Sequence, residues 1–198
     1  MIGLTGSIAM GKSTAAFMLK RMGIPVFDSD ASVHKLTAAG GQAVGAIKKV
    51  FPSVVTKKGI DRAAMGSIAY KDLAALRELE TILHPMVQDD RYRFLLRHAM
   101  LNTTCVVLDA PLLFEAGINK ICDAIFVVSA PFFLQRQRAL SRTGMTEEKF
   151  MTILKRQLSD AEKRQRSDVI IHSGLGKHRT WAQLRSAARD VKDSRCGI

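Results

Sequence analysis

The residues best suited to chemistry form a glycine-bounded loop close to the start of the chain. The pattern G-x-x-x-x-G-K-[ST] is matched by Gly6-Ser7-Ile8-Ala9-Met10-Gly11-Lys12-Ser13, and Thr14 follows directly. Glycine at both ends of this phosphate loop permits backbone angles that a Cβ atom would penalise, so the amides between can point at phosphate oxygens. Lys12 can reach the β- and γ-phosphates of a nucleotide, and the hydroxyl of Ser13 can ligate Mg²⁺. The loop therefore predicts binding of nucleotide phosphates.

Two carboxylates follow apolar segments and are candidates for metal binding and proton transfer. Asp109 ends the run Val106-Val107-Leu108 and can hold Mg²⁺ directly or through water. The alternative is an ordinary loop aspartate at a strand end. Asp30 follows the second apolar segment, which a parallel sheet places beside the phosphate loop, so its carboxylate can accept a hydroxyl proton. Alternatively, Asp30 caps a helix that starts at Ala31, and the residue pattern alone leaves both choices open.

Five short apolar segments alternate with helical patterns along the chain. Near-continuous apolar runs of this length suit strands buried on both faces, and helices between such strands indicate a parallel sheet covered on both sides. The sequence thus predicts an α/β fold, with a parallel five-stranded sheet flanked by helices, in a single domain spanning 1–198. The predicted strands are Ile2 to Thr5, Ile24 to Phe27, Cys105 to Leu108, Ala124 to Val128 and Val169 to Ile171.

Two long stretches interrupt the spacing of these strands. Residues 31–104 carry helical patterns and almost no strand signal, so we expect an all-helical insertion between the second and third strands. A second insertion, residues 133–167, is helical and rich in arginine. Both insertions belong to the same predicted domain.

Three helix starts are marked by capping residues. Asp61 is expected to be an N-cap, while Ser159 with Glu162 and Thr180 with Gln183 have the spacing of capping boxes. These signals predict helices that begin directly after Asp61, Ser159 and Thr180.

Length and composition predict a compact folded protein. The chain has 198 residues, of which 47% are apolar and 24% charged, as is ordinary for a globular domain. A formal charge of +12 attracts polyanions from nucleic acid to nucleotide phosphates, or simply aids solubility, so charge leaves the partner open.

No stretch approaches the roughly 18 consecutive apolar residues of a membrane helix, and no signal peptide is visible. Cys105, Cys122 and Cys196 lack metal-ligand spacing and are expected to be thiols in a reducing compartment, which favours the cytoplasm.

Several stretches, taken in order along nearly the whole chain, resemble the dephospho-coenzyme A kinase family. The phosphate loop is shared by many families, whereas the Asp-x-Asp, Leu-His-Pro and Pro-Leu-Leu-Phe-Glu stretches are far more specific. The family usually has glycine at the positions of Ser7 and Ala9, and Ala9 must adopt angles that glycine finds easier. The stretches are Ile2-Gly3-Leu4-Thr5-Gly6, Asp28-Ser29-Asp30 with His34, Gly59-Ile60-Asp61-Arg62, Leu83-His84-Pro85, Asp109 to Glu115, Gln135 with Arg138 and Arg142, Gln157, and Lys163-Arg164 before Ser167 to Ile170.

The resemblance implies a P-loop kinase fold like that of nucleoside monophosphate kinases, and it implies a reaction. ATP would donate its γ-phosphoryl group to the ribose 3′-hydroxyl of dephospho-coenzyme A, giving coenzyme A and ADP in the last step of coenzyme A synthesis. Residues 6–14 would bind ATP, with Lys12 also catalytic. Mg²⁺ would be the cofactor, held by Ser13 and Asp109. The family's catalytic carboxylate corresponds to the second aspartate of the Asp-x-Asp pair, which is Asp30 here.

The same resemblance assigns roles to the two insertions. Residues 31–104 would receive dephospho-coenzyme A, with His84 contacting it from a Leu83-His84-Pro85 turn, although a lone histidine is otherwise structural or exposed. Glu115 either faces the acceptor site or solvates a loop. Residues 133–167 resemble a lid in which Arg142 clamps the ATP phosphates on closure. The other basic residues of this segment can instead form a solvated helix face.

Three other functions are alternatives. Another small P-loop kinase with a nucleotide-like acceptor would share the fold and the donor. A nucleotide-dependent nucleic-acid binder would use the charge of +12, and a regulatory module would bind ATP without transfer. Neither of the last two explains the three specific stretches together. The sequence therefore predicts ATP and dephospho-coenzyme A as partners, without nucleic acid or membrane, and leaves the oligomeric state open.

Overall fold

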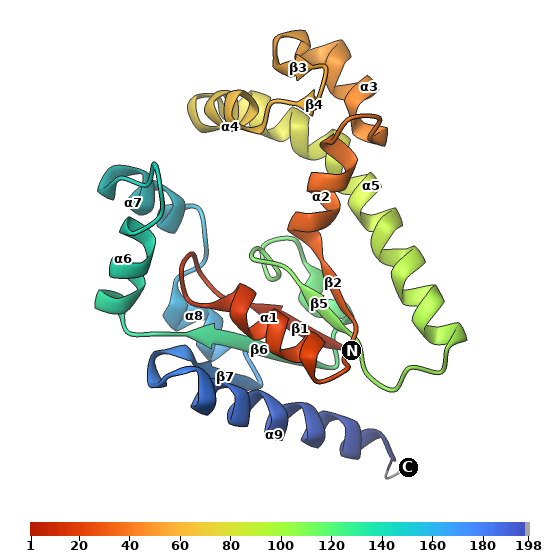
Figure 1. The fold of residues 1–198 in the computed structure, drawn as a ribbon, viewed down its shortest axis with the longest axis vertical. Helices are drawn as coiled ribbons and strands as arrows, with labels where there is room; N and C mark the ends of the chain where they lie inside the picture. Colours follow the sequence, from red (N-terminus) through yellow and green to blue (C-terminus); the bar gives the residue numbers. More distant parts are fainter. Residues whose placement is uncertain (197–198) are drawn as a thin grey trace. The chain divides into compact units, whose positions relative to one another are not determined.

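The computed structural model describes residues 1–196, with the backbone alone for 69–71 and 194–196. The side chain of Cys196, expected to be a thiol, therefore lies outside the described part. The chain forms two compact units. The first combines Met1–Phe27 with the chain from Thr103 onward, and the second is Asp28–Asn102. Figure 1 labels the helices and strands of both.

A five-stranded sheet forms the centre of the first unit, in the order β2-β5-β1-β6-β7. The central strand β1 runs parallel to both neighbours, with Ile2 opposite Val107 on one side and Ala124 on the other. The predicted parallel α/β sheet is confirmed, although the second and third strands begin two residues later than expected. The strands are β1 Ile2–Thr5, β2 Val26–Asp28, β5 Val107–Asp109, β6 Ala124–Ser129 and β7 Val169–His172.

Helices α1 (Lys12–Arg21) and α9 (Lys177–Cys196) pack together against this sheet (Figure 1). Their apolar faces share one core with alternate residues of the strands, and Leu19 and Leu184 in it are 0% exposed. Trp181 is partly buried at its edge. The other helices of the first unit are α6 Phe132–Leu140, α7 Glu147–Lys155 and α8 Asp160–Gln165, with short 3₁₀ turns at Ile118–Ile121 and Ser173–Leu175.

Two of the three predicted helix starts are confirmed. Asp61 caps α4, and Ser159 forms a complete capping box with Glu162. The box expected at Thr180 and Gln183 is wrong, because α9 begins one turn earlier at Lys177.

The physical reason lies in the turn before that helix. Gly176 has a φ of 92°, which lets the chain enter the helix directly after the 3₁₀ turn. Thr180 then lies inside the first helical turn and donates to the Gly176 carbonyl at 3.0 Å. The side-chain Oε1 of Gln183 is used elsewhere, because it accepts from the backbone N–H of His172 at 2.9 Å.

The second unit is mainly helical, and its core gathers apolar residues from all four of its helices. The prediction that it is all-helical is wrong at one place, a short antiparallel hairpin. The expected turn at Leu83-His84-Pro85 is also wrong, because these residues lie inside a 28-residue helix that continues through Pro85. The elements are α2 Ser29–Thr37, α3 Gln42–Val50, a 3₁₀ turn Pro52–Val54, β3 Val55–Thr56, β4 Gly59–Ile60, α4 Arg62–Lys71 and α5 Leu73–Met100. Among the described helices, none is both long enough and apolar enough to cross a membrane.

Candidate active site

The phosphate loop lies between the end of β1 and the start of α1. Both of its glycines are required by close contacts. A Cβ on Gly6 would come within 2.7 Å of the Val128 carbonyl oxygen, and one on Gly11 within 3.1 Å of the Ser173 hydroxyl. Gly11 also has a φ of 93° where it precedes α1, a conformation that glycine adopts without strain. The loop therefore brings backbone amides to the N-terminus of a helix, a favourable place for phosphate.

Ala9 has the left-handed backbone anticipated for it, with a φ of 61°. For a residue with a Cβ this conformation costs about 1–2 kcal/mol. Ala9 is 6% exposed and belongs to a small core with Ala139 of α6 and Phe150 of α7. Packing against these helices offsets the strain, which explains how alanine is accommodated where the family usually has glycine.

Phe150 offers a direct test of this packing, because it is 0% exposed and belongs to the same small core as Ala9. Phe150→Ala should lower the free energy of unfolding by about 3 kcal/mol through the cavity it leaves. Denaturant unfolding of the whole chain would measure the loss. Met151→Ala, on the next residue of α7 and 41% exposed, is the matched control and should change stability by less than about 1 kcal/mol. Equal small effects would mean that α7 is not anchored on the phosphate loop.

Lys12 and Asp109 meet at the carboxyl edge of the sheet. The Lys12 Nζ donates to the Asp109 Oδ1 at 2.6 Å, and their side chains are 12% and 3% exposed. Asp109 is the last residue of β5, and Lys12 follows the loop that leaves the adjacent strand β1. Open α/β sheets bind ligands at this edge. The two residues predicted to hold phosphate and metal are thus brought together.

The oxygen atoms near this pair suit Mg²⁺ in kind. Ser13 follows Lys12 in the first turn of α1 and supplies a hydroxyl, while Asp109 supplies a carboxylate. Among the described residues, no group of three or more His, Cys, Asp and Glu side chains is arranged to hold a metal. Magnesium in nucleotide sites typically takes one or two protein oxygens and the rest from phosphate and water, so the available donors fit it.

Arg138 and Ser173 lie against the phosphate loop and were not predicted as site residues. The Ser173 hydroxyl donates to the Met10 carbonyl at 2.6 Å, and Arg138 donates to the Ser173 hydroxyl and carbonyl at 3.0 and 3.1 Å. Arg142, the predicted clamp, is exposed one turn further along, just after α6. Arg138 and Arg142 are four residues apart, a spacing that fits one face of a helix. The sequence therefore could not tell which of the two arginines reaches the loop.

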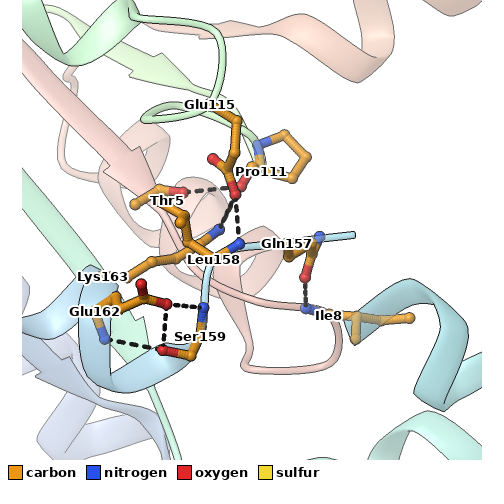
Figure 2. Close-up of polar contacts among 9 residues, drawn as sticks. All are labelled: Thr5, Ile8, Pro111, Glu115, Gln157, Leu158, Ser159, Glu162 and Lys163. Atoms are coloured by element: carbon orange, nitrogen blue, oxygen red, sulfur yellow. Dashed lines mark hydrogen bonds and ion pairs between the residues drawn. The ribbon is translucent and has the colours of Figure 1, made fainter. Parts of the chain in front are cut away.

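Glu115 is held by the segment that joins α7 to α8, as Figure 2 shows. Its Oε1 accepts from the Leu158 N–H at 2.8 Å and lies 3.4 Å from the Lys163 Nζ. Lys163 is 0% exposed and donates to the Pro111 carbonyl at 2.9 Å, which the Thr5 hydroxyl also reaches. Burial lowers the pKa of Lys163, and the negative charge of Glu115 opposes that shift. These contacts brace the loop after Asp109, while the acceptor role of Glu115 stays a prediction.

A cavity of about 490 Å³ opens at the carboxyl ends of β6 and β7. Apolar groups of Pro131, Phe132 and Leu175 line it together with the polar side chains of Asp160 and Arg164. The Asp160 Oδ1 is buried and has no hydrogen-bond partner among the described residues.

The second unit carries the other predicted residues on two packed helices. Asp28 caps α2 and accepts from the Ala31 N–H at 3.0 Å, so the alternative that Asp30 is the cap is wrong. Asp30 lies in the first turn, exposed, and its carboxylate has no hydrogen bond or ion pair among the described residues. His84 is exposed on α5, which a Ser32–Asp90 hydrogen bond of 2.9 Å joins to α2.

Comparison with known proteins places the chain in a family. The sequence model of the Dephospho-CoA kinase family matches residues 1–176, a span that includes all of the second unit and most of the first. The chain belongs to the dephospho-CoA kinase family. The predicted resemblance is thereby confirmed, and the protein is a P-loop kinase.

Relatives agree with that assignment, and solved structures share the fold. A dephospho-CoA kinase of Novosphingobium aromaticivorans is 47% identical over 193 residues, covering 98% of this chain and 95% of the relative. The crystal structure of TT1252 from Thermus thermophilus has a TM-score of 0.81 and 30% identity, covering 96% of this chain and 95% of that one. A dephospho-CoA kinase from Campylobacter jejuni, at 22% identity, shares the fold with a TM-score of 0.72 over 98% of both chains.

Proposed function

We propose that the protein transfers the γ-phosphoryl group of ATP to the ribose 3′-hydroxyl of dephospho-coenzyme A, giving coenzyme A and ADP. The observation that carries the proposal is the span of the family match, residues 1–176. A kinase related only through its phosphate loop would match the first unit, whereas this match includes the whole of Asp28–Asn102. The reaction is the last step of coenzyme A synthesis, and we expect it in the cytoplasm.

ATP is bound by the first unit in this proposal. Residues 6–14 surround the phosphates, Lys12 exchanges its ion pair with Asp109 for contacts to phosphate oxygens, and Arg142 adds a further positive charge. The cavity beside β6 and β7 receives the adenine ring. Ser13 and Asp109 would hold Mg²⁺, which neutralises charge on the phosphates when it is bound.

The acceptor is bound by residues of the second unit in this proposal. Asp30 takes the proton of the attacking hydroxyl, a role supported by an exposed carboxylate that is not used as a helix cap. His84 contacts the acceptor. Because α2 and α5 are packed helices of one unit, they can present both residues to one molecule.

The acceptor is tested by a panel of substrates at equal concentration with Mg-ATP. Dephospho-coenzyme A should be phosphorylated, while AMP, CMP and UMP should be poor acceptors. Binding energy from the pantetheine arm and diphosphate orients the reacting hydroxyl, so truncating the acceptor should cost rate as well as affinity. Mass spectrometry of the product identifies the phosphorylated position.

Three outcomes would favour an alternative function. Comparable turnover of a nucleoside monophosphate would assign the chain to another small P-loop kinase. ATP binding without any transfer would assign it to a regulatory module, and a salt-sensitive gel shift with DNA or RNA would favour a nucleic-acid partner for the charge of +12.

A further inference from the structure

Two glutamines far along the chain hold the backbone of Ile8 in the phosphate loop. The Ile8 N–H donates to the Gln157 Oε1 at 3.1 Å, and the Ile8 carbonyl accepts from the Gln135 Nε2 at 2.9 Å. An N–H can only donate and a carbonyl can only accept, so the partners fix which end of each glutamine amide faces the loop. The peptide groups before and after Ile8 are therefore both held.

Holding the second of these peptide groups sets the direction of the Ala9 amide. In a planar trans peptide the carbonyl and the following N–H point in opposite directions. Because Gln135 binds the Ile8 carbonyl, the Ala9 N–H points away from Gln135. This N–H has no hydrogen-bond partner among the described residues, whereas the Met10 N–H is already used by the Ser7 carbonyl.

The two glutamines are themselves held in place. Gln135 is 3% exposed on α6, one turn before Ala139, which packs in the same small core as Ala9. The backbone next to Gln157 is anchored by the Leu158 N–H on Glu115, and the capping box at Ser159 follows at once (Figure 2). Packing therefore holds Gln135, and its neighbours hold the backbone of Gln157.

We propose that Gln135 and Gln157 are positioning residues of the ATP site, which fix the Ile8 peptides so that the Ala9 amide is aimed at a phosphate oxygen. This rests on the proposed binding of ATP by the phosphate loop, though not on the identity of the acceptor. An amide aimed before the nucleotide arrives saves the ordering that binding would otherwise require. The same contacts fasten the predicted lid region, 133–167, to the loop at two places.

ATP affinity, measured by titration calorimetry without an acceptor, tests the proposal. Gln135→Met keeps the size of the side chain and removes the donor, so it should weaken ATP binding by at least about tenfold at every pH. Gln135→Glu should do so only when ionised. Burial raises the pKa of the introduced carboxyl above its ordinary value of about 4.3. At about pH 5.5 the protonated carboxyl donates a hydrogen bond to the Ile8 carbonyl. At about pH 8.5 the ionised carboxylate instead places a charged oxygen against that carbonyl.

Matched variants separate hydrogen bonding from added charge and from instability. Gln137→Glu makes the same change two residues away on the exposed side of α6 and should bind ATP like the wild type. Gln157→Glu adds a negative charge close to the loop but still presents an oxygen that accepts from the Ile8 N–H. The loss of ATP affinity in this variant therefore measures the effect of the added charge alone. Near-ultraviolet circular dichroism of Trp181 checks folding, and each affinity is compared with that of the wild type at the same pH.

The proposal is supported if Gln135→Glu recovers its affinity when the same sample is brought from about pH 8.5 to about pH 5.5. It is overturned if Gln135→Met binds ATP within about twofold of the wild type. It is also overturned if Gln135→Glu loses no more affinity than Gln157→Glu at the higher pH. If Lys12→Ala binds ATP normally as well, the loop is not the ATP site, and the proposed function fails instead.

Discussion

Lys12→Ala is expected to lower kcat/KM for phosphoryl transfer by at least about 10³-fold and to weaken ATP binding. The ammonium group neutralises charge on the transferred phosphoryl group, and Lys12 is the only lysine among residues 6–14. A coupled assay for ADP, with the acceptor saturating, would measure the loss. Turnover within a few fold of the wild type would show that the loop is not the donor site.

The ion pair with Asp109 adds an expectation about stability. Its carboxylate is 3% exposed beside Lys12, and removing one partner of a buried pair leaves a charge that is costly to bury. Lys12→Ala should therefore lower the free energy of unfolding by about 1–3 kcal/mol. The double variant Lys12→Ala/Asp109→Asn removes that charge and should recover stability without recovering activity, which separates a folding defect from a catalytic one.

Asp30→Asn is expected to reduce turnover by about 10²-fold or more, the usual scale for acid–base assistance. The change keeps the size of the side chain but removes its ability to accept a proton. ATP affinity should barely change, because the phosphate loop is untouched. Steady-state rates with dephospho-coenzyme A and a separate measurement of ATP binding would show the two effects.

Asp28→Asn is the matched control for this prediction. Asp28 caps α2, and asparagine caps helices about as well as aspartate, so both stability and turnover should stay near the wild-type values. A near-normal rate for Asp30→Asn would exclude Asp30 as the base. Equal losses of turnover in the two variants would mean that the combined negative charge of Asp28 and Asp30 matters, and that neither residue acts as a single proton acceptor.

The local pattern of the chain was sufficient for the sheet and for the phosphate loop. Alternating apolar runs and helices predicted all five strands of the sheet to within two residues. The Asp61 and Ser159 caps were predictable for the same reason, since a cap is a contact between residues three or fewer apart. The start of α9 was not, because Gln183 bonds to a strand end eleven residues away.

Choices between similar side chains were beyond the sequence. Arg138 and Arg142 lie one helical turn apart, and only Arg138 reaches the phosphate loop through Ser173. The sequence also left open whether Asp30 is a helix cap or a proton acceptor. The structure excludes the cap, because α2 begins at Ser29 and Asp28 is its N-cap. In the sequence, Lys163 is one basic residue among many. Its complete burial beside Glu115 depends on how α8 packs.

By itself, the sequence determined the P-loop, the parallel α/β architecture and the family. Each of these depends on residue spacing within one segment or on the order of segments, and both are written directly in the chain. Tertiary structure alone decided which side chains surround the loop. Lys12 bonds to a residue 97 positions away, and Ile8 to residues 127 and 149 positions away. Contacts over such distances have no local signature, because they form only when separate helices and strands pack on a common core.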